Sequence, residues 1–167
     1  MTRILTDVKY DFSDVLIQPE RSVLSSRSEI TLERHMKFRS GHEWTGVPVI
    51  LSNMDGVGTF EMAEIASKKY NMLTCLVKHY TLDELLAFYD KNKEWAPTHV
   101  CYSLGISDDD LNKYKEFKKR QYVKFVTIDV ANGYSEKFID FVKKFRDENP
   151  HIVLIAGNVA TTEITQQ

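Results

Sequence analysis

Five short apolar runs in this chain each end in polar residues, and this repeated pattern limits the folds open to it. The runs start roughly 25 residues apart, which is the spacing of repeated strand–helix units. Their polar ends are residues 52–55, 78–79, 103–105, 129–133 and 157–158. Polar residues at the carboxyl ends of parallel strands build the active site of a β/α barrel. The pattern therefore predicts an α/β fold, the first five units of an eight-unit TIM barrel, with an enzyme site that five units leave incomplete.

The expected strands are apolar almost throughout, as strands buried on both faces of a parallel sheet should be. They are expected over residues 47–53, 72–77, 99–103, 123–129 and 152–156. Helix start signals lie between them, namely a capping box, its acidic variant and two further N-caps. These are Thr81 with Glu84, Ser107 with Asp110, and Thr59 and Ser135.

The first 46 residues lack this regularity. They are expected to form an N-terminal extension packed on the barrel, and residues 47–167 the five units of a single incomplete barrel domain. Residues 30–34 alternate like a half-buried strand. A doubly wound sheet is the competing architecture, since it would cover both sheet faces. After the first strand, however, Gly56 and Gly58 give only G-x-G, which is weak evidence for the dinucleotide fingerprint of that fold.

The charge and composition exclude several classes of function. A net charge of −2 offers no basic field for nucleic acid and no polybasic patch for an anionic membrane. No apolar run has the length of a membrane span, no signal-peptide pattern opens the chain, and the two cysteines form no CxxC pair. The five histidines lack metal-ligand spacing, so no metal is expected. We therefore expect a soluble cytoplasmic protein, in which the Lys-rich stretch 113–124 forms a solvated helix face.

Several residues at the strand ends could carry chemistry. Lys78 could neutralise a phosphate, and Asp129 could accept a hydrogen bond from a ribose hydroxyl or an amide. Asn158 offers a donor and an acceptor, which suits a carboxamide, while Ser52 and Met54 could line a nucleotide pocket. The structural alternatives are a solvated lysine at position 78 and an aspartate at position 129 that only stabilises the following turn.

Several segments together resemble the IMP dehydrogenase/GMP reductase family of β/α barrels. They are residues 10–19, 53–55 with 57–63, 78–80, 129–135 (Asp-Val-Ala-Asn-Gly-Tyr-Ser) and 156–159. The resemblance runs along essentially the whole chain. It implies the reaction of the reductase branch, the NADPH-dependent reductive deamination of GMP to IMP and ammonia in purine nucleotide salvage. It also implies a homotetramer.

The resemblance further implies which residues form the site. Cofactor contacts are expected at Ser26, Arg27, Lys78, Asp129, Val130 and Ala131. Asn158 is expected near the nicotinamide and purine, and Ser52 and Met54 in the nucleotide pocket. The family's nucleophilic cysteine follows the sixth strand, and this residue and the proton-transfer threonine and glutamate are expected beyond Gln167. No catalytic residue is therefore assigned within the 167 residues, and the chain alone is predicted to be inactive.

The sequence leaves alternatives open. An IMP dehydrogenase-type catalytic domain is disfavoured because residues 80–83 run directly into a helix, where dehydrogenases usually carry inserted regulatory modules. A non-catalytic half-barrel that binds a partner and a lyase or aldolase with Lys78 as a Schiff-base amine are further alternatives. Gly56, Leu104 and Ile106 depart from the threonines usual in the reductases, and Leu51-Ser52 replaces their common Ala-Ala, which bears on the substrate contacts.

Overall fold

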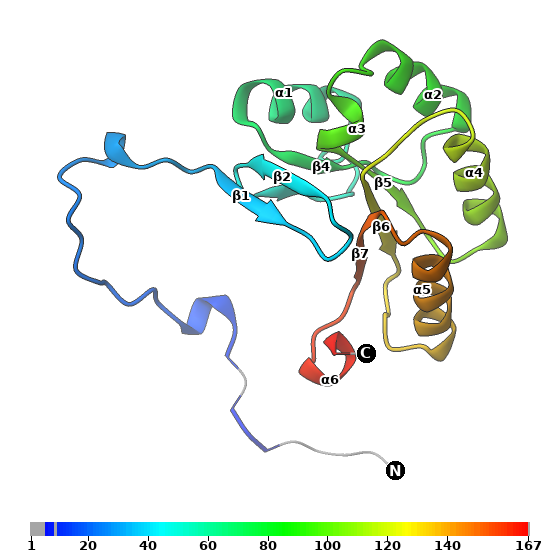
Figure 1. Cartoon of the computed structure of the whole chain (residues 1–167). Coiled ribbons are helices and arrows are strands. Elements are labelled where there is room, and N and C mark those ends of the chain that lie inside the picture. Colours follow the sequence, from blue (N-terminus) through cyan, green and yellow to red (C-terminus); the bar gives the residue numbers. More distant parts are fainter. Residues whose placement is uncertain (1–5, 9, 167) are drawn as a thin grey trace. The chain divides into compact units, whose positions relative to one another are not determined.

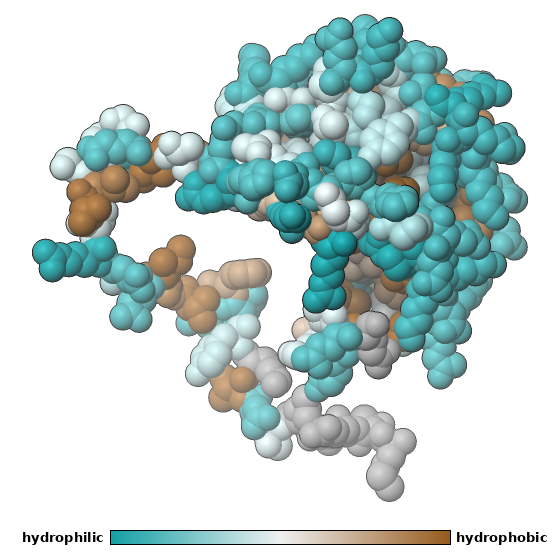
Figure 2. All heavy atoms as spheres, in the orientation of Figure 1, coloured by the Kyte–Doolittle hydropathy of each residue, from teal (hydrophilic) through white to brown (hydrophobic). Residues whose placement is uncertain are grey.

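The structure is a computed structural model that describes residues 6–8 and 10–166, and it divides into two units. The first unit ends at Thr31, and its described residues contain two short 3₁₀ turns, η1 (Phe12–Asp14) and η2 (Arg27–Glu29). Apolar side chains such as Leu16, Ile17 and Val23 are exposed along it, and Figure 2 shows apolar residues spread over the segment. All residues of the first unit that the structure describes are exposed.

The second unit is built on a five-stranded parallel sheet whose strands follow one another in chain order (Figure 1). The strands are β3 (Ile50–Leu51), β4 (Leu73–Cys75), β5 (Val100–Leu104), β6 (Phe125–Asp129) and β7 (Val153–Gly157). The five predicted strands are thereby confirmed, with shifted ends. The first is much shorter than the predicted 47–53, because only Ile50 and Leu51 pair with β4.

Helices follow the strands, and the four longer ones begin where the sequence predicted. They are α1 (Phe60–Tyr70), α2 (Leu82–Lys91), α3 (Ala96–His99), α4 (Asp108–Lys118), α5 (Glu136–Glu148) and α6 (Thr162–Thr165). The side-chain hydroxyl of each predicted N-cap residue accepts a hydrogen bond from a backbone N–H of the first helical turn; these residues are Thr59, Thr81, Ser107 and Ser135. The capping box of Thr81 and Glu84 is complete. The short α3 was not predicted from the sequence. Pro97 lies in its first turn, where the missing N–H costs no helical bond.

The helices cover one face of the sheet (Figure 1). Their apolar sides meet the outward side chains of the strands in a core rich in aromatic rings. The ring of Phe117 lies 5.0 Å from those of both Tyr89 and Tyr102, and all three side chains are buried. Burying a large apolar side chain stabilises a fold by roughly 1.5–3 kcal/mol, so this outer core holds the helices on the sheet. The doubly wound alternative is wrong, because the described helices lie on a single face.

A hairpin occupies part of the opposite, inner face. Strands β1 (Arg34–Lys37) and β2 (Glu43–Gly46) pair antiparallel, and buried Trp44 packs its ring 6.5 Å from that of Phe125 at the start of β6. The prediction of a strand over residues 30–34 is wrong except at Arg34. The partner strand ends at Gly46, which pairs with Arg34, and the following Val47 N–H bonds to Asn71 O, so the strand pairing begins at Arg34. The predicted division of the chain at residue 46 stays a prediction.

The sheet is curved around its inner face. Strands β4 and β6 flank β5, so in a flat sheet they would lie roughly 9–10 Å apart. The thiol of Cys75 on β4 is nevertheless 3.2 Å from the Thr127 hydroxyl on β6. The inner face is therefore concave, and the five strands form the wall of a half-barrel, as the sequence predicted. None of the helices in the described part of the chain is long and apolar enough to cross a membrane.

Candidate active site

Two opposite charges meet at the carboxyl edge of the sheet. Lys78 follows β4, Asp129 ends β6, and the Lys78 ammonium lies 3.9 Å from the Asp129 carboxylate. Gly105, which follows the intervening β5, lies beside Lys78, since a β-carbon added there would be 3.9 Å from Lys78 Nζ. The two side chains are 35% and 30% exposed, so a ligand at the edge of the sheet can still reach both charges. The sequence named both residues separately, and the fold brings them together.

A residue that the sequence did not single out holds this edge in place. The Lys113 ammonium on α4 donates hydrogen bonds to the backbone carbonyls of Lys78, at 2.8 Å, and of Tyr80, at 3.1 Å. The prediction that 113–124 is a solvated face is therefore wrong at Lys113. The sequence shows several lysines on this helix but not which of them reaches back over the loop between β4 and α2. Lys113 fixes the backbone from which Lys78 projects.

The loops after β6 and β7 are joined by backbone hydrogen bonds. Val130 N–H donates to Gly157 O and Asn158 N–H donates to Val130 O, each at 2.9 Å. Gly133 N–H donates to Asn158 O at 3.0 Å, and a β-carbon at Gly133 would lie 2.6 Å from that same oxygen. Only glycine allows this approach. The exposed Asn158 side chain is thus held close to the end of β6 that carries Asp129.

The last residues of the 129–135 motif stabilise the loops after β6 and β7. The Tyr134 hydroxyl accepts a hydrogen bond from Ala160 N–H at 2.8 Å, and hydrogen bonding to Thr161 lowers its pKa below the usual value. Ser135 caps α5. These contacts fasten the segment after β7 against the loop after β6. The aspartate faces the site, while the residues at the end of the motif support the loop that holds Asn158.

Ser52 and Met54 lie beyond the end of β3 in an exposed loop. Met54 O accepts the N–H groups of Val57 and Gly58, so Met54 sits in a turn and not on the strand. Gly58 O in turn accepts Val77 N–H at 2.8 Å, which places this loop beside the end of β4. Gly58 permits the contact, because a β-carbon there would lie 2.4 Å from Cys75 O. The loop therefore reaches the same edge of the sheet as Lys78.

Two predicted cofactor residues lie elsewhere in the chain. Ser26 and Arg27 belong to the first unit, where the Ser26 hydroxyl accepts Ser28 N–H at 3.2 Å and so caps η2. Their predicted role therefore stays a prediction.

The two cysteines lie on the concave face below the charged edge. Cys75 and Cys101 are aligned on neighbouring strands, and both thiols approach the Thr127 hydroxyl, at 3.2 and 2.9 Å. Burial raises the pKa of Cys101 well above its usual value. A buried neutral thiol is a poor nucleophile, which favours a packing role for this residue. Within the described ranges, no group of three or more histidine, cysteine or acidic residues is placed to hold a metal ion.

Comparison with known proteins extends these observations. The family model described as "IMP dehydrogenase / GMP reductase domain" matches residues 9–167. The chain belongs to this family. The resemblance seen in the sequence is thereby confirmed, including its β/α-barrel fold. Within the family, the chain is 46% identical to the GMP reductase of Yersinia pestis (strain Pestoides F) and equally to that of Yersinia pseudotuberculosis serotype O:1b (strain IP 31758).

The same matches show how much of the family barrel is present. Each of the two alignments covers 99% of this chain and 48% of the reductase. A crystal structure of inosine 5′-monophosphate dehydrogenase from Legionella pneumophila superposes with a TM-score of 0.70 at 28% identity, covering 90% of this chain and 44% of that one. The chain therefore spans about half the length of the family members that it matches.

Proposed function

We propose that this chain is the N-terminal part of an NADPH-dependent GMP reductase, an oxidoreductase that converts GMP to IMP and ammonia in purine nucleotide salvage. The observation that carries the proposal is the Lys78–Asp129 pair at the carboxyl edge of the sheet, in a chain 46% identical to proteins named GMP reductase. Active sites of β/α barrels lie at this edge.

The reductase branch fits better than the dehydrogenase branch. Helix α2 begins at Leu82, directly after the Lys78–Tyr80 loop, so no inserted module separates β4 from its helix. The 28% identity to a solved dehydrogenase is also lower than the identity to the reductases. An IMP dehydrogenase-type catalytic domain is therefore the second candidate.

The chemistry of the edge suits a dinucleotide cofactor. NADPH, when bound, would supply the hydride. Lys78 would neutralise phosphate charge, Asp129 would accept from a ribose hydroxyl or an amide, and the neighbouring Val130 and Ala131 would complete the contact. Ser26 and Arg27 of the first unit would add to it. The fit rests on two features: both charges are partly open to solvent, and Lys113 holds the lysine's backbone in place. A cation with a fixed backbone can bind an anionic group without reordering the loop.

The remaining assignments follow from the family. Ser52 and Met54 would line the nucleotide pocket, and the exposed Asn158 amide would orient the purine or the nicotinamide. The nucleophilic cysteine and the proton-transfer threonine and glutamate would come from the part of the barrel after the fifth unit. We place the assembled enzyme, a homotetramer without a resident metal, in the cytoplasm. Gly56, Leu104 and Ile106 are expected to change substrate contacts near β3 and β5.

A chimeric enzyme tests the function. The 167 residues are fused to the portion of the Yersinia pestis GMP reductase that follows the matched half, and NADPH oxidation is followed with GMP. We expect IMP and ammonia as products, and a raised KM for NADPH in Lys78→Met with little change in the control Lys115→Met. A chimera that oxidises IMP with NAD⁺ and leaves GMP untouched would contradict the proposal. Turnover by the 167 residues alone would contradict the placement of the catalytic residues.

A further inference from the structure

A cavity of about 470 Å³ lies at the amino edge of the sheet, at the end of the strands opposite Lys78 and Asp129. Its walls are the loops that lead from α4 into β6 and from α5 into β7, and it is lined by residues 118–123 and 148–152 together with Tyr114. Cavities of roughly 300–1,000 Å³ have the size that holds small molecules. Neither Lys78 nor Asp129 lines this amino-edge cavity, so it is a candidate binding site of its own.

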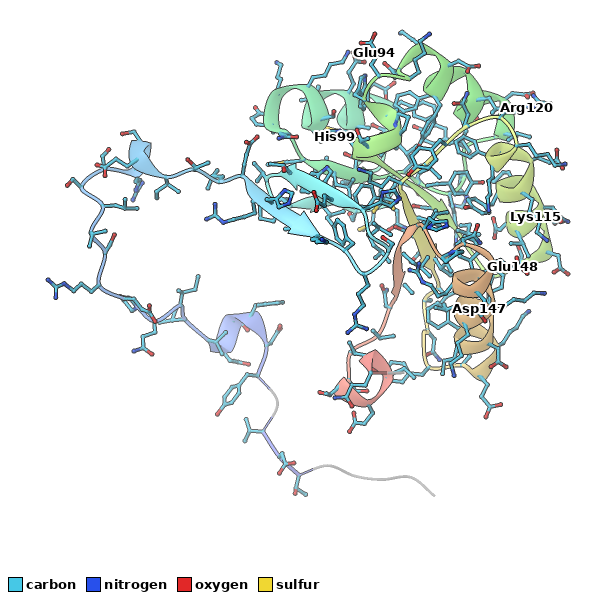
Figure 3. The ribbon with its side chains drawn as sticks, viewed as in Figure 1. Glu94, His99, Lys115, Arg120, Asp147 and Glu148 are labelled. Carbon is cyan, nitrogen blue, oxygen red and sulfur yellow. The ribbon has the colours of Figure 1, made fainter. Side chains whose placement is uncertain are left out.

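The lining of the amino-edge cavity is mainly positive. Three cations, Lys118, Lys119 and Arg120, stand against one carboxylate, Glu148, among its lining residues, and Figure 3 labels Arg120 and Glu148. Lys119 is neutralised by Glu116, at 2.6 Å. Neither Lys118 nor Arg120 forms an ion pair with any residue that the structure describes. Two cations are therefore available to neutralise a bound anion.

A nearby histidine responds to the same positive charge. His42 lies in the turn between β1 and β2, and its Nε2 is 3.0 Å from the Tyr122 hydroxyl beside the cavity. Burial lowers the pKa of His42, and the positive charge of Lys124 lowers it further. Cations that disfavour a further positive charge at this place attract an anion to it.

The floor of the cavity orients one of the two available cations. Lys118 Nζ donates a hydrogen bond to Asn149 Oδ1 at 2.5 Å, and the Tyr114 hydroxyl donates to the same oxygen at 3.4 Å. Asn149 is buried and fixed in turn, because its Nδ2 donates to Phe145 O at 2.8 Å. An ammonium has more than one N–H donor, so Lys118 is held at the cavity and keeps donors for a ligand.

The same cavity offers an aromatic surface. Tyr122 lines it and is 55% exposed, while its hydroxyl is held by His42. The buried side chains of Val123 and Ile152 add apolar lining. A tyrosine ring that is exposed but held at its hydroxyl can stack against a flat ring of a ligand.

We propose that the amino-edge cavity binds a mononucleotide, with its phosphate on Lys118 and Arg120 and its base against Tyr122. A guanidinium donates paired N–H groups to a phosphate, and an ammonium acts as a point charge, so the two side chains complement each other. The site goes beyond the proposed function, because the reaction proposed above uses the carboxyl edge of the barrel.

Titration with AMP tests the site. The 167-residue chain is labelled with ¹⁵N, and its backbone amide signals are followed by NMR as AMP or inorganic phosphate is added. AMP is used because the reaction proposed above does not consume it. We expect both ligands to shift amide signals within 118–123 and 149–152, and AMP to bind more tightly than phosphate. Lys78→Met should leave these shifts unchanged.

Matched charge removals separate a site from a general positive field. Lys118→Met combined with Arg120→Met should weaken AMP binding at least about tenfold, because both phosphate contacts are lost. Lys115→Met combined with Lys144→Met is the control, since it removes the same charge from exposed positions on α4 and α5. Tyr122→Leu should reduce the affinity for AMP to that for phosphate, whereas Tyr122→Phe, which keeps the ring, should not.

The outcomes decide the proposal independently of the GMP reductase assignment. Circular dichroism first establishes that each variant is as helical as the original chain. Shifts confined to amides around Lys78, equal weakening by the two double variants, equal affinities for AMP and phosphate, or no shifts at millimolar AMP would overturn the site. Weakened AMP binding in the Lys118 and Arg120 double variant and in Tyr122→Leu, with the control unchanged, would uphold it whatever the chimeric enzyme does with GMP.

Discussion

Replacing Lys113 tests whether the bonds seen at the edge of the site stabilise the fold. Lys113→Met keeps most of the apolar stem and removes the two hydrogen bonds to Lys78 O and Tyr80 O. A hydrogen bond to a charged group contributes about 1.5–3 kcal/mol when it is well shielded. Both bonds are only partly buried, and the released carbonyls regain water. We therefore expect the variant to lose about 2 kcal/mol of unfolding free energy, taking about 1 kcal/mol for each bond.

Urea unfolding followed by circular dichroism measures this loss. With an m-value of about 2 kcal/mol per molar, the midpoint should fall by about 1 M. Lys115→Met is the matched control, because Lys115 is exposed and extends from the outer side of the same helix (Figure 3). An exposed substitution of this kind changes stability by less than about 0.5 kcal/mol. Equal midpoints for the two variants would refute the reasoning that Lys113 holds the loop.

Three further predictions concern stability. Gly58→Ala should lower the unfolding free energy by about 2–3 kcal/mol, because the added β-carbon would crowd Cys75 O. Gly56→Ala, where the β-carbon has open space at a φ of +78°, should lower it by only about 1 kcal/mol. Equal urea midpoints for the two variants would contradict the crowding at Gly58. Burial lowers the pKa of His99, so the unfolded chain binds more protons than the folded chain below about pH 6.5. The unfolding free energy should therefore fall from pH 7 to pH 5, and it should depend less on pH in His99→Gln. Burial raises the pKa of Tyr89, so the unfolded chain loses this proton first, and the unfolding free energy should fall as pH rises above about 10. If Tyr89→Phe loses stability over the same alkaline pH range as the original chain, Tyr89 is not the cause.

The parallel sheet could be predicted because its pattern is local. Buried strands are apolar in nearly every position, and a hydroxyl before each main helix marks where the helix starts, as Thr81 and Ser135 do. The same local logic failed at residues 30–33. Their alternation suits a strand, but a strand also needs a neighbour, and the neighbouring chain turns away at Val47.

The site could be predicted only in part, for a related reason. Lys78 and Asp129 are each identifiable as polar residues that end apolar runs. Their 3.9 Å separation depends on the curvature of three strands, which no short window of sequence encodes. The role of Lys113 could not be predicted, because its hydrogen bonds to the loop after β4 depend on how α4 packs beside that loop. A sequence pattern identifies lysine as charged but does not show which carbonyls it reaches.

The contact between Cys75 and Thr127 across β5 has a consequence for how such a protein is made. The five-stranded sheet is curved by the packing of its own side chains, so its curvature does not depend on closure of the barrel. In a relative of about twice this length, the ribosome releases the equivalent half first, at roughly 5–20 residues per second. The later strands of that relative would then pair with the edges of a sheet that is already curved, so the barrel would close without a further change in the curvature of the first five strands.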